Sequence, residues 1–350
     1  MAGARSPRRG PVAVLAGAFP PAVLGWREVF VPLAVVVHSQ HGLVLATAAL
    51  AVAAGRAGEW FHARTGVARP GNQAALVAGL ALLLLGFVPE EGPLGLLLWI
   101  VFGLAWPALR ETVAGLGRTP AAVLAWLLLG MVLAGPLALG PGTWPVAAGC
   151  FFLAWRLRAW RGDGQAPDPS PPERSQPEPT PGNPRLGFLF GLSVLTWIWL
   201  MPAWLVAAGL PVAWCGAVFA GAWLLRGVAA RYAEGLVAGP AAGSWLLALA
   251  ALAAALSVLG QIWATSPWQM GLLLALHGLL LGLVAGHPSL VRPETLAPLP
   301  AAQALGELVG PVAGAVLLLL GSTTGVFAGG AVAALVLGGA LAIAGPVETS

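Results

Sequence analysis

The stretch "EWFHARTGVARPG", residues 59–71, lies between two long apolar runs and concentrates charge in a chain that has little of it. It contains one acid, one histidine and two arginines, whereas only 9% of the 350 residues are charged. The charges are interleaved and followed by Gly and Pro, the residue types that most often interrupt or end a helix. The stretch therefore predicts a short polar turn between two apolar helices.

The composition of the whole chain predicts a membrane protein. Hydrophobic residues make up 58% of it and the mean hydropathy is +0.85, which leaves too little charge to cover a soluble surface. Apolar runs of about 20 residues recur, each long enough to cross roughly 30 Å of hydrocarbon. They predict twelve helices, at 11–37, 41–60, 72–88, 93–113, 120–140, 143–159, 186–208, 210–230, 236–260, 267–286, 299–320 and 323–345.

The distribution of arginine supports this count. If the N-terminus is cytoplasmic, the N-terminal tail and the cytoplasmic connections hold sixteen of the 17 basic residues, Arg56 and Arg226 among them, and only Arg27 is left out. Cytoplasmic connections of membrane proteins are enriched in this way, and one missed helix would destroy the pattern. We expect a multi-pass protein of the inner or plasma membrane with both termini cytoplasmic, and we attribute the net charge of +4 to topology rather than to a nucleic-acid partner.

The segment "RGDGQAPDPSPPERSQPEPTPGNPR", residues 161–185, divides the chain. It is rich in Pro and charge and lacks hydrophobic periodicity, so it is predicted to be a disordered cytoplasmic linker. The resulting domains are a first six-helix bundle at 1–160 and a second at 186–350. The fold class expected is an all-α membrane protein of two six-helix bundles.

The two halves carry similar short patterns at equivalent places. "GMVLAGPLALG" (130–140) and "GELVGPVAGA" (306–315) each set a Gly-Pro pair inside a predicted helix. Ala63-Arg64 after the second predicted helix has a counterpart in Ala230-Arg231 after the eighth. Together these matches favour parallel repeats, as in transporters built from two related halves.

This architecture resembles the major facilitator superfamily (MFS) of secondary transporters. The family's signature between helices 2 and 3 runs Gly-x-Leu-Ala-Asp-Arg-x-Gly-Arg-Arg, and Arg64, Gly66 and Arg69 fit its later part. Ala63 stands where the acid belongs, and Glu59 where the first Gly belongs. The resemblance implies a gating role for Arg64 and Gly66, and Glu59, one helical turn before Ala63, is the candidate for the missing carboxylate.

A second family pattern, Gly-x-x-x-Gly-Pro-x-x-Gly, is known chiefly from helix 5 of antiporters. Here the fuller match lies in the eleventh predicted helix, and the fifth keeps only a Gly-Pro pair and a shifted Gly, so antiport is not inferred. The matching residues are Gly306, Gly310, Pro311 and Gly314, with Gly135 and Pro136 in the fifth helix.

Ionisable residues inside predicted helices are candidates for a substrate or proton site, because they are costly in a membrane and usually face a cavity or a partner. Arg27 and Glu28 lie in the first helix, unless that helix ends earlier and leaves both at the outer interface. Glu307 is a candidate proton acceptor in the eleventh helix, the alternative being an acid that pairs with an Arg near the cytoplasmic mouth. His277 is a candidate in the tenth, or a histidine bonded to a neighbouring helix.

Three tryptophans cluster in the seventh predicted helix, in "LTWIWLMPAW". In the resembled family, helices 1, 4, 7 and 10 line a central cavity, which implies that Trp197, Trp199 and Trp204 form an aromatic wall for an apolar solute. Packing in a core or against lipid is the alternative.

The function expected is secondary active transport of a small hydrophobic or weakly polar solute by alternating access, with export favoured and protons as the candidate coupling ion. A transport-inactive membrane sensor or assembly factor is the alternative, since the signature acid is missing. A membrane enzyme is disfavoured because both Asp lie in the linker and no His or acid pair is spaced for catalysis. Cys150 and Cys215 lie in separate helices and indicate neither a disulfide nor a metal site, and no cofactor is expected.

Overall fold

The computed structural model describes residue 29 and residues 42–65, 71–88, 92–114, 120–139, 143–162, 183–237, 242–287, 290 and 299–344. Within these ranges every regular element is a helix. The first predicted span, 11–37, lies outside them except for Val29, and so do Arg27 and Glu28.

Five helices form the first half of the described chain. They are α2 (Gly42–Thr65), α3 (Gly71–Leu85), α4 (Pro93–Ala114), α5 (Pro120–Ala138) and α6 (Thr143–Gly162). Their limits agree closely with the predicted ones except at the end of α2. There the helix continues through Trp60 and Arg64 to Thr65, because nothing in this polar stretch breaks a helix before Gly66. Arg56 is therefore a helical residue and not part of a connection.

The second half contains α7 (Pro184–Leu195), the 3₁₀ helix η1 (Ile198–Leu200), α8 (Met201–Ala207), α9 (Val212–Val237), α10 (Ala242–Gly260), α11 (Pro267–Ala285), α12 (Ala301–Leu320) and α13 (Thr323–Ile343). With α7, η1 and α8 taken as one interrupted rod, the described residues hold eleven rods. A total of twelve spans stays a prediction. Five rods of this half are long and apolar enough to cross a membrane, namely α7–α8, most of α9, and α11, α12 and α13.

The interruption between α7 and α8 was not predicted, although its cause is visible in the sequence. Pro202 has no backbone N–H, and its ring clashes with the carbonyl four residues earlier in a regular helix. Two side chains bond carbonyls near the break: the Thr196 hydroxyl donates to Leu192 O (2.6 Å), and Trp199 Nε1 donates to Thr196 O (2.9 Å). The regular α-helix is thus interrupted at η1, and these two side chains satisfy carbonyl groups beside the break.

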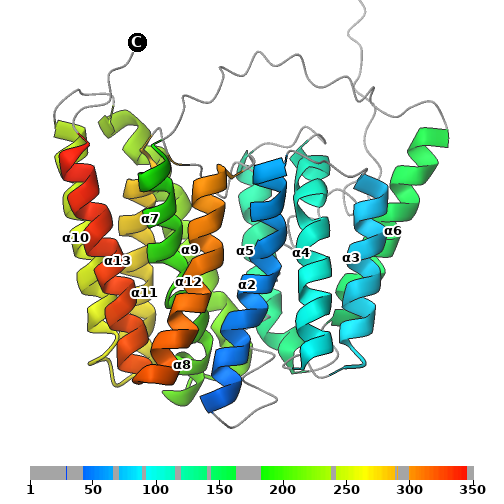
Figure 1. Cartoon of the computed structure of the whole chain (residues 1–350), viewed down its shortest axis with the longest axis horizontal. Helices are drawn as coiled ribbons and strands as arrows, with labels where there is room; N and C mark the ends of the chain where they lie inside the picture. The colour runs from blue at the N-terminus through cyan, green and yellow to red at the C-terminus, as the bar shows by residue number, and fades with distance from the viewer. Residues whose placement is uncertain are drawn as a thin grey trace, which may run out of the picture.

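The rods stand side by side in two groups (Figure 1). α2, α3, α4 and α6 pack together in one group, and α7, α9, α10, α11, α12 and α13 in the other. The groups meet where α2 packs along α12. α5, which belongs to the first half by sequence, packs along α9 of the second group and is a second contact between the halves. Whether the domain limits are those predicted, 160 and 186, stays a prediction.

Successive rods run in opposite directions, so the two ends of the molecule can be named after the helices that end there. α2 ends and α12 begins at the top of Figure 1, which we call the α2-end face. α5 and α9, whose directions are reversed, end and begin at the opposite side, the α5-end face. These two names are used below to locate individual contacts between the halves.

Candidate functional site

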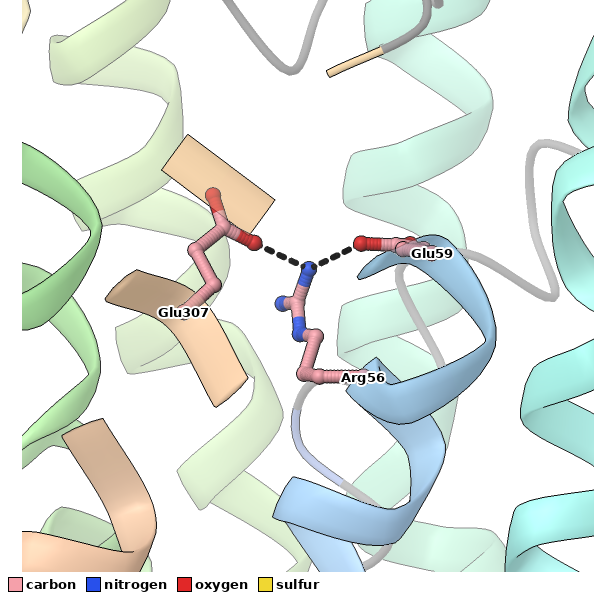
Figure 2. A network of polar contacts seen from close by, with 3 residues as sticks. All are labelled: Arg56, Glu59 and Glu307. Carbon is pink, nitrogen blue, oxygen red and sulfur yellow. Dashed lines mark hydrogen bonds and ion pairs between the residues drawn. The ribbon is translucent and has the colours of Figure 1, made fainter. Parts of the chain in front are cut away.

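Three charged side chains meet between the two halves near the α2-end face. Arg56 of α2 donates through Nη1 to Oε2 of Glu307 on α12 at 2.6 Å and to Oε2 of Glu59 on its own helix at 3.1 Å. Figure 2 shows the two carboxylates on opposite sides of the guanidinium, with the same nitrogen between them. The cluster places one acid in the same bundle as the arginine and one acid in the other bundle.

The cluster is largely shielded from solvent. The exposed fractions of the side chains are 10% for Arg56, 5% for Glu59 and 14% for Glu307. A charge removed from water keeps its ionised form only with a partner of opposite sign, and removal of one partner of a buried pair typically costs about 3–5 kcal/mol. The pair between Arg56 and Glu307 therefore favours the arrangement in which α2 and α12 are in contact.

Close packing on α7 holds Glu307 in place. A Cβ atom at Gly191 of α7 would lie 2.7 Å from the backbone nitrogen of Glu307, so the two helices touch backbone to backbone. Gly306, Gly310 and Gly314 of α12 all face α7 residues from Phe188 to Thr196 in the same way. The glycine pattern of the eleventh predicted helix thus packs α12 within the second half, and it leaves the Glu307 side chain directed toward α2.

The Gly-Pro pair of the fifth predicted helix has a different position. A Cβ atom at Gly135 of α5 would lie 2.6 Å from the carbonyl oxygen of Ala213 on α9. Reciprocally, Gly216 of α9 faces the carbonyl of Met131 on α5. Pro136 beside it is exposed, whereas Pro311 of α12 is buried. Gly135 therefore belongs to the contact between the halves at the α5-end face.

His277 is buried inside the second half, on α11. Its Nδ1 lies 3.2 Å from the Ser257 hydroxyl and 3.3 Å from Ala254 O, both on α10. Because the Ser257 hydroxyl donates to Ala254 O (2.6 Å), the hydrogen of this pair lies on Nδ1 of the histidine. The sequence left two alternatives for His277, a residue of a solute site or a histidine bonded to a neighbouring helix. The contacts with α10 are those of the second alternative.

The three tryptophans of the seventh rod lie in the protein core. Trp197 and Trp199 are buried, and the Trp197 ring packs edge-on against His277 with 4.8 Å between ring centroids. Trp204 packs against Phe327 of α13 at 5.5 Å. η1 itself lies against α2, so this aromatic cluster reaches the boundary between the halves.

The remaining predicted gating residues that the structure describes do not join the Arg56 cluster, and Arg231, predicted to follow its helix, lies inside α9. Arg64 is exposed in the last turn of α2, and Arg231 is exposed on α9. Gly66 and Arg69 lie outside the described residues. Of the signature between the second and third helices, Glu59 contacts Arg56 on its own helix, and Arg56 in turn contacts Glu307 of the second half.

Two arginines of the site region were missed as functional candidates because both were assigned to connections. Arg56 stands three residues before Glu59 in an apolar run, and this spacing puts both side chains on one helix face. Arg226 is buried on α9, with its guanidinium carbon 4.9 Å from the ring centroid of Trp223 and 5.4 Å from that of Phe190. Arg56 and Arg226 each lie inside a predicted helix, 41–60 and 210–230, and that position was the available signal for both.

No group of three or more His, Cys, Asp or Glu side chains suited to a metal ion occurs among the described residues.

Comparison with known proteins gives matches of structure alone. No family profile matches the sequence, and no curated protein matches it.

The structure of the nucleoside transporter NupG, in a point-mutant form, aligns with 94% of this chain and 98% of its own, with a TM-score of 0.66 and 11% sequence identity. That of a mutant peptide transporter, POT, aligns with 97% of this chain and 96% of its own, with a TM-score of 0.58 and 16% identity. The chain therefore shares its overall helical fold with these two transporter structures, and at these identities the likeness concerns the fold alone.

Proposed function

We propose that the protein is a secondary active transporter that moves a small solute by alternating access between its two bundles. The observation that supports this best is the ion pair between Arg56 of α2 and Glu307 of α12. It joins the bundles near one face, while the contact of α5 with α9 joins them near the other. Alternating access requires contacts of this kind that break and form in turn.

Glu307 is the proposed coupling group. In this proposal its carboxylate alternates between two partners, the Arg56 guanidinium when α2 and α12 are in contact and a proton when they are apart. Protonation in turn removes the charge that holds the two helices together. A proton gradient could thus drive the opening and closing of the α2-end face, which the arginine topology assigns to the cytoplasm.

The proposed solute is hydrophobic or weakly polar. The charged side chains that the structure places between the halves are paired with one another, and the neighbouring interior is apolar and aromatic around Trp197 and Trp204. Such surroundings suit a solute with little charge to neutralise. Export is the direction proposed.

The test is uptake of a panel of solutes into proteoliposomes, with and without an imposed pH gradient. We expect gradient-dependent movement by the wild type and loss of that dependence in Glu307→Gln, with Glu28→Gln tested in parallel because Glu28 lies outside the described residues. Glu111→Gln, an acid elsewhere on α4, is the control. Gradient-driven transport that survives in both Glu307→Gln and Glu28→Gln would rule out the coupling role.

The competing function is that of a transport-inactive sensor or assembly factor, favoured by Ala63 in place of the signature acid. In that case no solute of the panel would move, while the contact between α2 and α12 would still respond to a bound ligand. Uptake and the spacing of the two helices, measured on the same preparation, separate the two functions.

A further inference from the structure

One nitrogen of Arg56 serves both acids of the cluster, and this geometry gives Glu59 a role distinct from that of Glu307. Both contacts end on Nη1. The two carboxylates therefore compete for the same donor group, and they repel each other across it. Glu59 sits three residues from Arg56 on the same helix, so their contact does not depend on where α12 lies.

We propose that Glu59 is a positioning residue that retains Arg56 when the bundles separate, so that Arg56 exchanges one carboxylate for the other. This rests on the proposed alternating-access function and assigns a further residue to it. The 2.6 Å contact with Glu307 and the longer 3.1 Å contact with Glu59 describe the joined state. On separation, Glu59 stays within reach and takes over the whole guanidinium.

The energetic consequence concerns the difference between the two states. In a variant without Glu59, Glu307 is the one of these two carboxylates that remains, and separation of α2 from α12 takes it away from Arg56. Loss of Glu59 therefore lowers the free energy of the joined state relative to that of the separated state. With Glu59, the arginine retains a carboxylate in both states. Loss of Glu59 should therefore have the opposite effect to loss of Glu307: it should hold the α2-end face closed.

The experiment measures the spacing between the α2 and α12 ends. Spin labels are attached at Thr65→Cys and Ala301→Cys in full-length protein whose buried cysteines are replaced (Cys150→Ala, Cys215→Ala), and distances are recorded in lipid nanodiscs. Glu59→Gln and Glu307→Gln are compared with the parent protein, each with and without Arg56→Gln. Glu59→Asp, which keeps the charge, is the conservative variant and replaces Glu59→Gln if the latter does not fold.

We expect Glu307→Gln to enlarge the long-distance population, and Glu59→Gln to reduce it about tenfold and to slow transport. Glu59→Asp should restore most of the parent distribution. In the Arg56→Gln background, Glu59→Gln should shorten the distances much less, since it then relieves only the repulsion between the two carboxylates. The proposal is overturned if Glu59→Gln leaves the distances unchanged or lengthens them, or if its effect is as large without Arg56 as with it.

These outcomes separate this proposal from the proposed function. If Glu307→Gln lengthens the distance but Glu59→Gln does not shorten it, the ion pair between the bundles stands and the role of Glu59 falls. If Glu59→Gln shortens the distance through Arg56 but no solute is moved by any variant, the exchange stands and transport falls.

Discussion

At the scale of single residues, this protein places its few interior polar groups in pairs that link helices. Glu307 was predicted as a proton acceptor or as the partner of an arginine, and the structure shows the pairing with Arg56. The partner could not be predicted, because 251 residues separate the two in sequence and the chain offers sixteen other arginines. His277 was predicted as a solute ligand or as a bonded core residue, and it lies against Ser257 and Ala254 of α10.

His277 gives a first prediction. Replacement by Phe removes the hydrogen bonds to α10 and leaves the Ser257 hydroxyl without its contact, so we expect a loss of about 1–3 kcal/mol of stability. The two buried cysteines supply the measurement, since a thiol-reactive dye labels them when heat unfolds the protein. Transport per folded molecule should be kept. A variant that melts like the wild type but no longer transports would assign His277 to the solute site instead.

His287, just beyond the end of α11, gives a prediction for pH. Burial lowers the pKa of this histidine from its ordinary value of 6.5, because the charged form is desolvated. The unfolded chain then binds more protons than the folded one at acidic pH, so the stability that depends on neutral His287 is present above about pH 6.5 and is lost as the pH falls below it. Melting temperatures measured between pH 5 and 8 should fall less steeply on the acid side in His287→Gln. Parallel curves for the two proteins would contradict this.

At the scale of elements, the helix limits could be predicted well and the contacts between helices could not. Apolar run length sets where a span begins and ends, which is why α3, α4, α11 and α12 lie within a few residues of their predicted limits. The break after α7 is due to Pro202, a local cause that was noted only as a neighbour of the tryptophans. Which helix a glycine faces depends on the fold as a whole, and the two Gly-Pro pairs, similar in sequence, face different partners.

The packing of α12 on α7 gives a third prediction. A Cβ atom at Gly314 would meet the carbonyl oxygen of Thr196 and lie 2.7 Å from Trp199 Nε1, so Gly314→Ala should cost about 1–3 kcal/mol through overpacking. Gly339→Ala on α13 is the matched control, since its Cβ would meet nothing within 4 Å and alanine favours a helix by about 1 kcal/mol. The melting temperatures of both variants are compared with that of the wild type, and we expect a lower value for Gly314→Ala alone. Equal melting temperatures for Gly314→Ala and the wild type would show that α7 and α12 can move apart at low cost.

At the scale of the whole molecule, the described structure is joined at both faces, by charge near one and by glycine near the other. The all-helical architecture was predicted from the apolar runs, and the structure and its likeness to two solved structures confirm it. The division into two six-helix bundles at the linker stays a prediction. Twelve spans and the cytoplasmic location of both termini stay predictions. Sequence spacing could not reveal that the α5 and α9 glycines oppose the Arg56 cluster across the molecule, since this relation exists only after the bundles are assembled.

The two contacts between the bundles should act in opposition, which gives a fourth prediction. Val in place of Gly216 would push its side chain against the Met131 carbonyl and separate α9 from α5. We expect the α5-end face to open and the α2-end face to close further, the reverse of the result for Glu307→Gln. Spin labels at Leu139 and Trp214, both exposed, report the first face and labels at Thr65 and Ala301 the second. If both faces open together, the bundles do not pivot about a shared centre.

The backbone contact between α7 and α12 also has a mechanical consequence. At Gly306, Gly310 and Gly314 the backbones of the two segments are close, so little side-chain volume is left there to rearrange. Glu307 lies beside the first of these glycines, and Trp199 lies beside the last. We therefore expect a displacement of α12 at the ion pair to be accompanied by a displacement of the segment around Trp199, and the reverse.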